Sequence, residues 1–143
     1  MLKHIPPLLN GDLLKILRDM GHGDELTISD ANYPSHSNHA RVVHVDGADT
    51  TTVLEAILTL MPLDEFVDSP VLVMSPGPGE AAPVQAAYQA VCDKVAGRPI
   101  KISPLPRFDF YPRAAKSYAC VATLERRLYG DLIIKKGVLK PGE

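Results

Sequence analysis

The chain has 143 residues and a formal net charge of −2, with 45% hydrophobic and 22% charged residues. This length suits one domain with a single core. The longest basic runs are the pairs Arg126-Arg127 and Lys135-Lys136, and these do not provide the dense cationic face that a nucleic acid or an anionic membrane requires. We therefore expect a single domain over residues 1–143 that binds neither a nucleic acid nor a membrane.

The sequence also bears on the cellular compartment. Its two cysteines, Cys92 and Cys120, lie far apart in apolar helix-like and strand-like segments, which is typical of buried free thiols in a reducing environment. No apolar run approaches the ~20 residues of a membrane-spanning helix, and the first residues lack the apolar region of a signal peptide. We therefore expect a cytoplasmic protein.

The first predicted elements are a helix, a strand and a loop. Apolar residues recur at i, i+4 and i+7 from Leu13, which predicts an amphipathic helix over residues 12–20. Residues 25–29 alternate as a strand does. Residues 32–40 are too rich in Pro, Ser, Asn and His for regular structure, so we expect an exposed loop there.

The middle of the chain predicts two more strands, each followed by a helix. The strand over residues 41–45 precedes an Asp-Gly turn and a helix that Asp49 caps and Pro62 ends. The unbroken apolar run of residues 71–74 is typical of a central strand covered on both faces. A helix over residues 80–96 comes next, and the Pro-Gly loop before it lacks the Lys-Ser or Lys-Thr pair of a phosphate-binding loop.

The last third predicts strands over residues 100–103, 118–123 and 132–134 and an aromatic helical segment over residues 108–116. Residues 132–134 are too apolar to stay exposed as an edge strand, so we expect a neighbouring molecule to cover them. Helices that alternate with strands act as crossovers between neighbouring strands. The pattern as a whole therefore predicts a layered α/β domain.

The loop around His22 concentrates groups that can do chemistry. His22 stands between Gly21 and Gly23, which leaves room for a small ligand to approach the imidazole. Asp30 directly follows a predicted strand, where the ligand groups of α/β sheets usually lie. We expect the loop over residues 32–40 to lie beside both side chains.

Other chemistries have little support in the sequence. His36, His39 and His44 are spaced like metal ligands, but two lie in a polar loop and one in a strand, without the partners found in zinc sites. No pattern indicates a serine or cysteine nucleophile. We therefore expect no metal site, and a proton-transfer site built on His22 is the interpretation that is left.

Short motifs in a fixed order extend from the first residues nearly to the last. They are Ile5-Pro6-Pro7-Leu8, Met20-Gly21-His22-Gly23-Asp24, Asp30-Ala31-Asn32, Arg107-Phe108, Phe110-Tyr111, Glu125-Arg126, Tyr129-Gly130 and Lys135-Lys136-Gly137-Val138. Together they resemble the family of L-fucose mutarotases and D-ribose pyranases. The two aromatic motifs and the C-terminal motif make the chain more similar to the fucose branch.

The resemblance implies a cofactor-free isomerase that acts on a neutral, fucose-like monosaccharide. It implies a three-layer α/β/α sandwich whose subunits form rings, commonly stacked decamers, with sites near the subunit contacts. It also implies that His22 is the general acid/base and that the sugar is held by Asp30, Arg107, Tyr129, Gly130 and Asp131.

One position departs from the family pattern. The family usually has Asn where this chain has Asp131. An Asn side chain donates and accepts hydrogen bonds, whereas an ionised Asp only accepts them. We therefore expect the contacts with the sugar to differ at this position.

Exchange of sugar anomers suits these residue types. The reaction removes a proton from the O1 hydroxyl and adds one to the ring oxygen, then reverses both steps after the C1–C2 bond rotates. A histidine, with an ordinary pKa of about 6.5, can do both, and such catalysis typically supplies ~10²–10⁴-fold. Two alternatives stay open, a D-ribose pyranase-type interconversion of pyranose and furanose forms and a sugar-binding module without catalysis.

Overall fold

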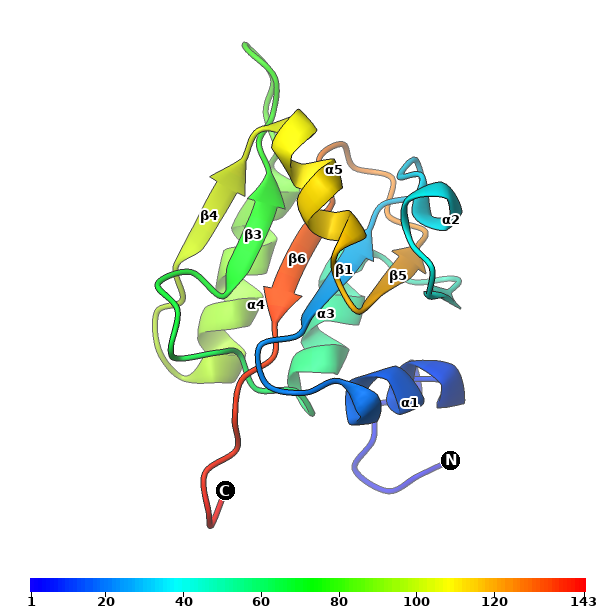
Figure 1. Cartoon of the computed structure of the whole chain (residues 1–143), viewed down its shortest axis with the longest axis vertical. Coiled ribbons are helices and arrows are strands. Elements are labelled where there is room, and N and C mark those ends of the chain that lie inside the picture. The colour runs from blue at the N-terminus through cyan, green and yellow to red at the C-terminus, as the bar shows by residue number, and fades with distance from the viewer.

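The computed structural model describes residues 1–143 as one six-stranded sheet with helices on both faces (Figure 1). The helices are α1 (Gly11–Asp19), α2 (Ser35–Asn38), α3 (Thr50–Leu58), α4 (Val84–Ala96) and α5 (Arg107–Ala115). The strands are β1 (Glu25–Ser29), β2 (Val42–Val45), β3 (Val71–Met74), β4 (Ile102–Leu105), β5 (Ala119–Thr123) and β6 (Leu132–Lys135). Helices α3 and α4 lie behind the sheet in Figure 1 and α5 lies in front of it, so the layered α/β architecture is confirmed.

The strand order is β2-β5-β1-β6-β3-β4. Strand β5 pairs in parallel with both β1 and β2, and β3 pairs in parallel with β4, while β6 runs antiparallel to β1 and β3. The carboxyl ends of five strands therefore meet at the upper edge in Figure 1, where β6 begins. The loop between β5 and β6 delivers its side chains to this edge.

Strand β6 corrects one expectation from the sequence. Its residues Leu132, Ile133 and Ile134 are fully buried in the middle of the sheet, between β1 and β3. The prediction that a neighbouring molecule must cover this segment is therefore wrong, because strands of the same chain cover both of its edges.

Local signals explain most element boundaries. The Asn10 side chain accepts a hydrogen bond from the Leu13 N–H at 2.9 Å and begins α1, and Asp49 does the same for α3. Gly97 ends α4 in the left-handed conformation, with φ of 66°. Two details differ from prediction: the segment 32–40 contains the short α2, and α5 begins at Arg107, one residue before the predicted helical segment.

Both faces of the sheet carry buried side chains. The larger cluster packs α1, α3 and α4 against one face, and a smaller cluster that includes Tyr33 and Phe110 packs α5 against the other. Cys92 and Cys120 are buried free thiols, as predicted. No helix combines the length and the apolar character needed to cross a membrane.

Candidate functional site

A small cavity opens at the carboxyl edge of the sheet. Its volume is about 200 Å³, room for roughly six or seven water molecules at about 30 Å³ each. Four of the residues predicted to hold a sugar line it, namely Asp30, Arg107, Tyr129 and Asp131. The structure therefore brings together side chains from the end of β1, from α5 and from the loop before β6.

Two larger hollows, of about 270 and 420 Å³, lie at the opposite side, next to the C-terminal segment. Several of their charged groups already have partners: Glu65 pairs with Lys140, and the Lys136 ammonium donates to the backbone oxygens of Leu17 and Met20. A ligand site needs converging polar groups that are free to bind. We therefore place the candidate site in the smaller cavity.

Two carboxyl groups form the base of this cavity. Asp30 accepts a hydrogen bond from the backbone N–H of Asn32 at 2.9 Å, and the Oδ1 atom of Asp131 accepts one from the backbone N–H of Asp30 at 2.8 Å. Burial, and then the nearby Asp30 charge, raise the pKa of Asp131 to about 8. Asp131 is buried without a cationic partner, so with this pKa it differs near neutral pH from an ionised Asp, which only accepts hydrogen bonds.

Aromatic rings and one guanidinium group form a wall of the cavity. The rings of Tyr33 and Tyr111 stack with centroids 5.6 Å apart, and the Tyr33 hydroxyl is fixed by His39 Nε2 at 2.9 Å. The Arg107 guanidinium carbon lies 5.9 Å from the centre of the Tyr111 ring. A stacked aromatic surface beside a planar donor suits a ligand that has both apolar faces and hydroxyl groups.

The turn before β6 places Tyr129 and Gly130 at the mouth of the cavity. Tyr129 adopts a left-handed conformation, with φ of 58°, and its hydroxyl donates to the Glu80 carboxylate. Gly130 packs so closely that a Cβ atom there would lie 2.8 Å from the Glu125 Cγ and 3.3 Å from the Asp30 Cβ. This turn therefore holds an unfavourable backbone conformation that neighbouring contacts must stabilise.

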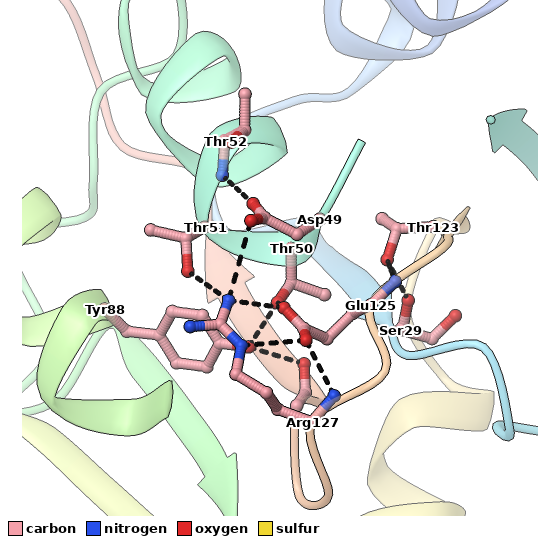
Figure 2. A network of polar contacts seen from close by, with 10 residues as sticks. Ser29, Asp49, Thr50, Thr51, Thr52, Tyr88, Thr123, Glu125 and Arg127 are labelled. Carbon is pink, nitrogen blue, oxygen red and sulfur yellow. Dashed lines mark hydrogen bonds and ion pairs between the residues drawn. The ribbon is translucent and has the colours of Figure 1, made fainter. Parts of the chain in front are cut away.

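A partly buried polar network supplies those contacts (Figure 2). The Arg127 guanidinium donates to both Glu125 oxygens, and the Thr50 hydroxyl donates to one of them at 2.9 Å. The Tyr88 hydroxyl donates to the Gly130 carbonyl at 2.8 Å. The hydrogen bonds from Arg127 lower the pKa of Glu125 to about 2. The network thus ties the site turn to α3 and α4.

His22 lies at the other end of the sheet. It precedes β1, whereas Asp30 follows β1, and a five-residue strand spans roughly 17 Å. The expectation that the segment 32–40 lies beside both His22 and Asp30 is therefore wrong within one chain. The structure brings Asp30, Arg107, Tyr129, Gly130 and Asp131 together but does not bring His22 to them.

The partner of His22 is Asp64, which the sequence did not indicate. The Nε2 atom of His22 lies 3.1 Å from the Asp64 Oδ1, and the Phe66 ring lies 5.4 Å from the imidazole. Although burial alone would raise the pKa of Asp64, hydrogen bonds from the Phe66 N–H and from His22 hold it below its usual value. The His22 side chain is 47% exposed, so it remains open to a second molecule.

The other histidines do not form a metal-binding cluster. The Nε2 atoms of His36 and His44 lie 2.9 Å apart at the surface, while His39 is buried against Tyr33. No group of three or more His, Cys, Asp or Glu side chains is arranged to hold a metal ion.

Comparisons with known proteins find relatives over nearly the whole chain. A sequence model of the RbsD / FucU transport protein family matches residues 3–139. The L-fucose mutarotase of Actinobacillus pleuropneumoniae serotype 5b (strain L20) is 45% identical over 140 residues, which cover 96% of this chain and 97% of that protein. The L-fucose mutarotase of Haemophilus influenzae (strain 86-028NP) is 43% identical over 140 residues, with the same coverage.

Solved structures agree as well. The fucose mutarotase of Streptococcus pneumoniae in complex with L-fucose superposes with a TM-score of 0.91 at 42% identity, covering 97% of this chain and 100% of that one. Bacillus subtilis RbsD complexed with D-ribose superposes with a TM-score of 0.74 at 23% identity, covering 98% of this chain and 100% of that one. The second comparison supports the fold alone.

Proposed function

Because this chain belongs to the RbsD / FucU transport protein family, we propose that it is an L-fucose mutarotase that interconverts the α and β anomers of the sugar without a cofactor. The observation that carries the proposal is the cavity at the carboxyl edge of the sheet, where Asp30, Asp131, Arg107 and Tyr129 converge beside stacked aromatic rings. Relatives at 43–45% identity are L-fucose mutarotases.

The cavity chemistry fits a neutral sugar. The carboxyl groups of Asp30 and Asp131, the Arg107 guanidinium and the Tyr129 hydroxyl supply both donors and acceptors to sugar hydroxyls. An apolar cavity would leave those hydroxyls unpaired, at about 1–3 kcal/mol each. The Tyr33–Tyr111 stack offers an apolar surface to the sugar ring. These residues bind and orient the substrate.

His22 supplies the proton transfer. Its imidazole takes the O1 proton and gives it to the ring oxygen O5 as the C1–O5 bond breaks and C1 becomes a carbonyl. After the C1–C2 bond rotates, the reverse transfers close the ring on the opposite face of the carbonyl. The Asp64 carboxylate, 3.1 Å from Nε2, orients the imidazole and stabilises its charged form.

Because His22 cannot reach the cavity of its own chain, we propose that a second copy of the chain brings its His22–Asp64 pair to the cavity. Exposed apolar side chains mark both ends of such a contact: Phe66 is 75% exposed beside His22, while Phe108 and Leu128 are 80% and 62% exposed beside the cavity. A contact between two different surfaces repeats around a ring. We therefore propose a ring-shaped homo-oligomer, stacked as a decamer.

A mixing experiment tests both the chemistry and the assembly. His22→Ala and Arg107→Ala proteins should each lose L-fucose anomer exchange, measured by saturation-transfer NMR. After the two are co-refolded at equal amounts, about a quarter of the contacts should join an intact cavity to an intact His22. Exchange that stays absent in a mixed oligomer, or wild-type exchange by a monomer in light scattering, contradicts the shared site.

The same NMR measurement defines the substrate. Exchange should be faster for L-fucose than for D-ribose, D-galactose and D-glucose. Binding of L-fucose without faster exchange would indicate a sugar-binding module. The buried free thiols Cys92 and Cys120 support a cytoplasmic location, which we also propose.

A further inference from the structure

The two carboxyl groups at the base of the cavity have no cation between them. Asp30 and Asp131 are both buried, and neither forms a salt bridge. The nearest ion pair, Glu125 with Arg127, is satisfied within its own network. Arg107 lines the same cavity but contacts aromatic rings instead. Two adjacent buried carboxylates without a counter-ion repel each other, so the pair retains a proton.

The hydrogen bonds indicate which carboxyl group holds that proton. Burial raises the pKa of Asp30 too, but backbone N–H groups of Asn32, Tyr33 and Gly130 oppose that rise, and the Asn32 N–H donates to the carboxylate at 2.9 Å. The Asp131 carboxyl group accepts from only one N–H, that of Asp30, through Oδ1. The anion is therefore better stabilised on Asp30, and the proton belongs on the Oδ2 atom of Asp131.

We propose that Asp131 serves this cavity as a neutral carboxylic acid, whose Oδ2–H donates a hydrogen bond to an acceptor oxygen of the bound sugar. A protonated Asp has the donor and acceptor pattern of an amide. A protonated Asp131 thus offers the same donor and acceptor as an Asn, but unlike Asn it can lose its proton. The donation to a sugar rests on the function proposed above.

The proposal has a consequence at alkaline pH. Burial raises the pKa of Asp131 to about 8, so the donor is present below that pH and is lost above it. The other groups that face Asp131 are the Asp30 carboxylate, with the Glu125 carboxylate next to it, the Cys120 thiol, the Arg107 guanidinium and the hydroxyls of Tyr33, Tyr88 and Tyr129. Burial raises the pKa of Tyr33 and Tyr88 further above the ordinary phenol value, so these two stay neutral in this range.

The experiment compares the wild-type chain with Asp131→Asn, which keeps the shape and the donor but cannot titrate. Calorimetry at pH 6 to pH 9.5 measures the dissociation constant for L-fucose. For the wild type we expect affinity to fall about tenfold between pH 7 and pH 9, as the protonated fraction falls. The variant, which has no titratable group at this position, should show no such fall between pH 7 and pH 9.

A second measurement needs no variant. The carboxyl ¹³C shift of Asp131 in the wild-type chain, without sugar, should titrate near pH 8. Titration near pH 4, or alkaline profiles that coincide for the two proteins, overturns the proposal.

Failure of the proposed function has a different signature. In that case L-fucose neither binds nor exchanges its anomers at any pH, and the proposed donation to the sugar is overturned too. The ¹³C titration still reports whether Asp131 keeps its proton.

Discussion

The Nε2 atom of His22 lies 3.1 Å from the Oδ1 atom of Asp64, at the edge of the sheet opposite to the cavity. The pair joins a loop before β1 to the segment that follows α3. Asp64 is buried and its backbone N–H donates to the Lys135 carbonyl at the end of β6. The imidazole is therefore held on a rigid support, yet is exposed enough to enter the cavity of another copy.

Replacement of His22 should remove catalysis and leave the fold intact. His22→Ala removes a half-exposed ring, and His22→Gln can hydrogen-bond but cannot titrate near neutral pH. We expect L-fucose anomer exchange to fall ~10²–10⁴-fold in both, with unchanged circular dichroism. His36→Ala, which removes an exposed imidazole outside the cavity, is the control. Wild-type exchange by a folded His22→Ala protein would place the chemistry elsewhere.

Much of the fold could be predicted because its signals are local. Three of the four residues in the strand over residues 71–74 are buried, as the unbroken apolar run indicates. Asn10 and Asp49 begin helices with their own side chains. The place of β6 was missed because an apolar segment is equally compatible with an edge strand that a partner covers and with a central strand. Only the pairing with β1 and β3 decides between them.

The site was predictable in part for the same reason. The place of Asp30 in the site could be predicted because Asp30 stands at the end of a strand. Arg107 and Tyr129 could be assigned to the site only through the family resemblance. The pairing of His22 with Asp64 joins segments 42 residues apart, and no local pattern reports it. The protonation of Asp131 depends on burial and on the absence of a cation, which only the folded chain shows.

Gly130 should not tolerate a side chain. A Cβ atom at this position would lie 2.8 Å from the Glu125 Cγ and 3.1 Å from the Arg127 carbonyl oxygen. We expect Gly130→Ala to lower the free energy of unfolding by about 1–3 kcal/mol and to weaken L-fucose binding, as measured by denaturation and calorimetry. Gly11→Ala, where nothing lies within 4 Å, should be neutral or slightly stabilising. Equal behaviour of the two variants would contradict the close packing of the turn.

Tyr88 should act on the site through Gly130, although it does not line the cavity. Tyr88→Phe keeps the ring but leaves the Gly130 carbonyl without its donor, at about 1–3 kcal/mol of unfolding free energy. We also expect a raised KM for L-fucose, because the turn that carries Tyr129 loses a support. Tyr118→Phe is the control, since the Tyr118 ring packs under the Arg41 guanidinium away from the cavity. An unchanged KM for Tyr88→Phe would limit Tyr88 to stability.

Glu125 should make the chain sensitive to acid. Its pKa is lowered to about 2 by hydrogen bonds from Arg127, while in the unfolded chain it takes its ordinary value of about 4.3. A lowered folded-state pKa contributes stability above the unfolded value, and that contribution disappears as the pH falls toward 2. The contribution is at most about 3 kcal/mol, and less where solvent screens the half-exposed Arg127 guanidinium.

Urea denaturation at pH 7, 5, 4 and 3 measures this effect. For the wild type, we expect Glu125 to change the free energy of unfolding little between pH 7 and pH 5. Below pH 4.5, protonation of Glu125 should lower the free energy of unfolding. Glu125→Gln should be less stable than the wild type at pH 7, because Arg127 loses its partner and the Thr50 hydroxyl loses an anionic acceptor. It should also lose less stability on acidification, so the two curves should draw closer between pH 5 and pH 3. The control, Glu143→Gln at the exposed C-terminal end, should run parallel to the wild type. Parallel curves for Glu125→Gln would mean that Glu125 takes up its proton equally in the folded and unfolded chains, and that the network around it does not hold the site turn by charge.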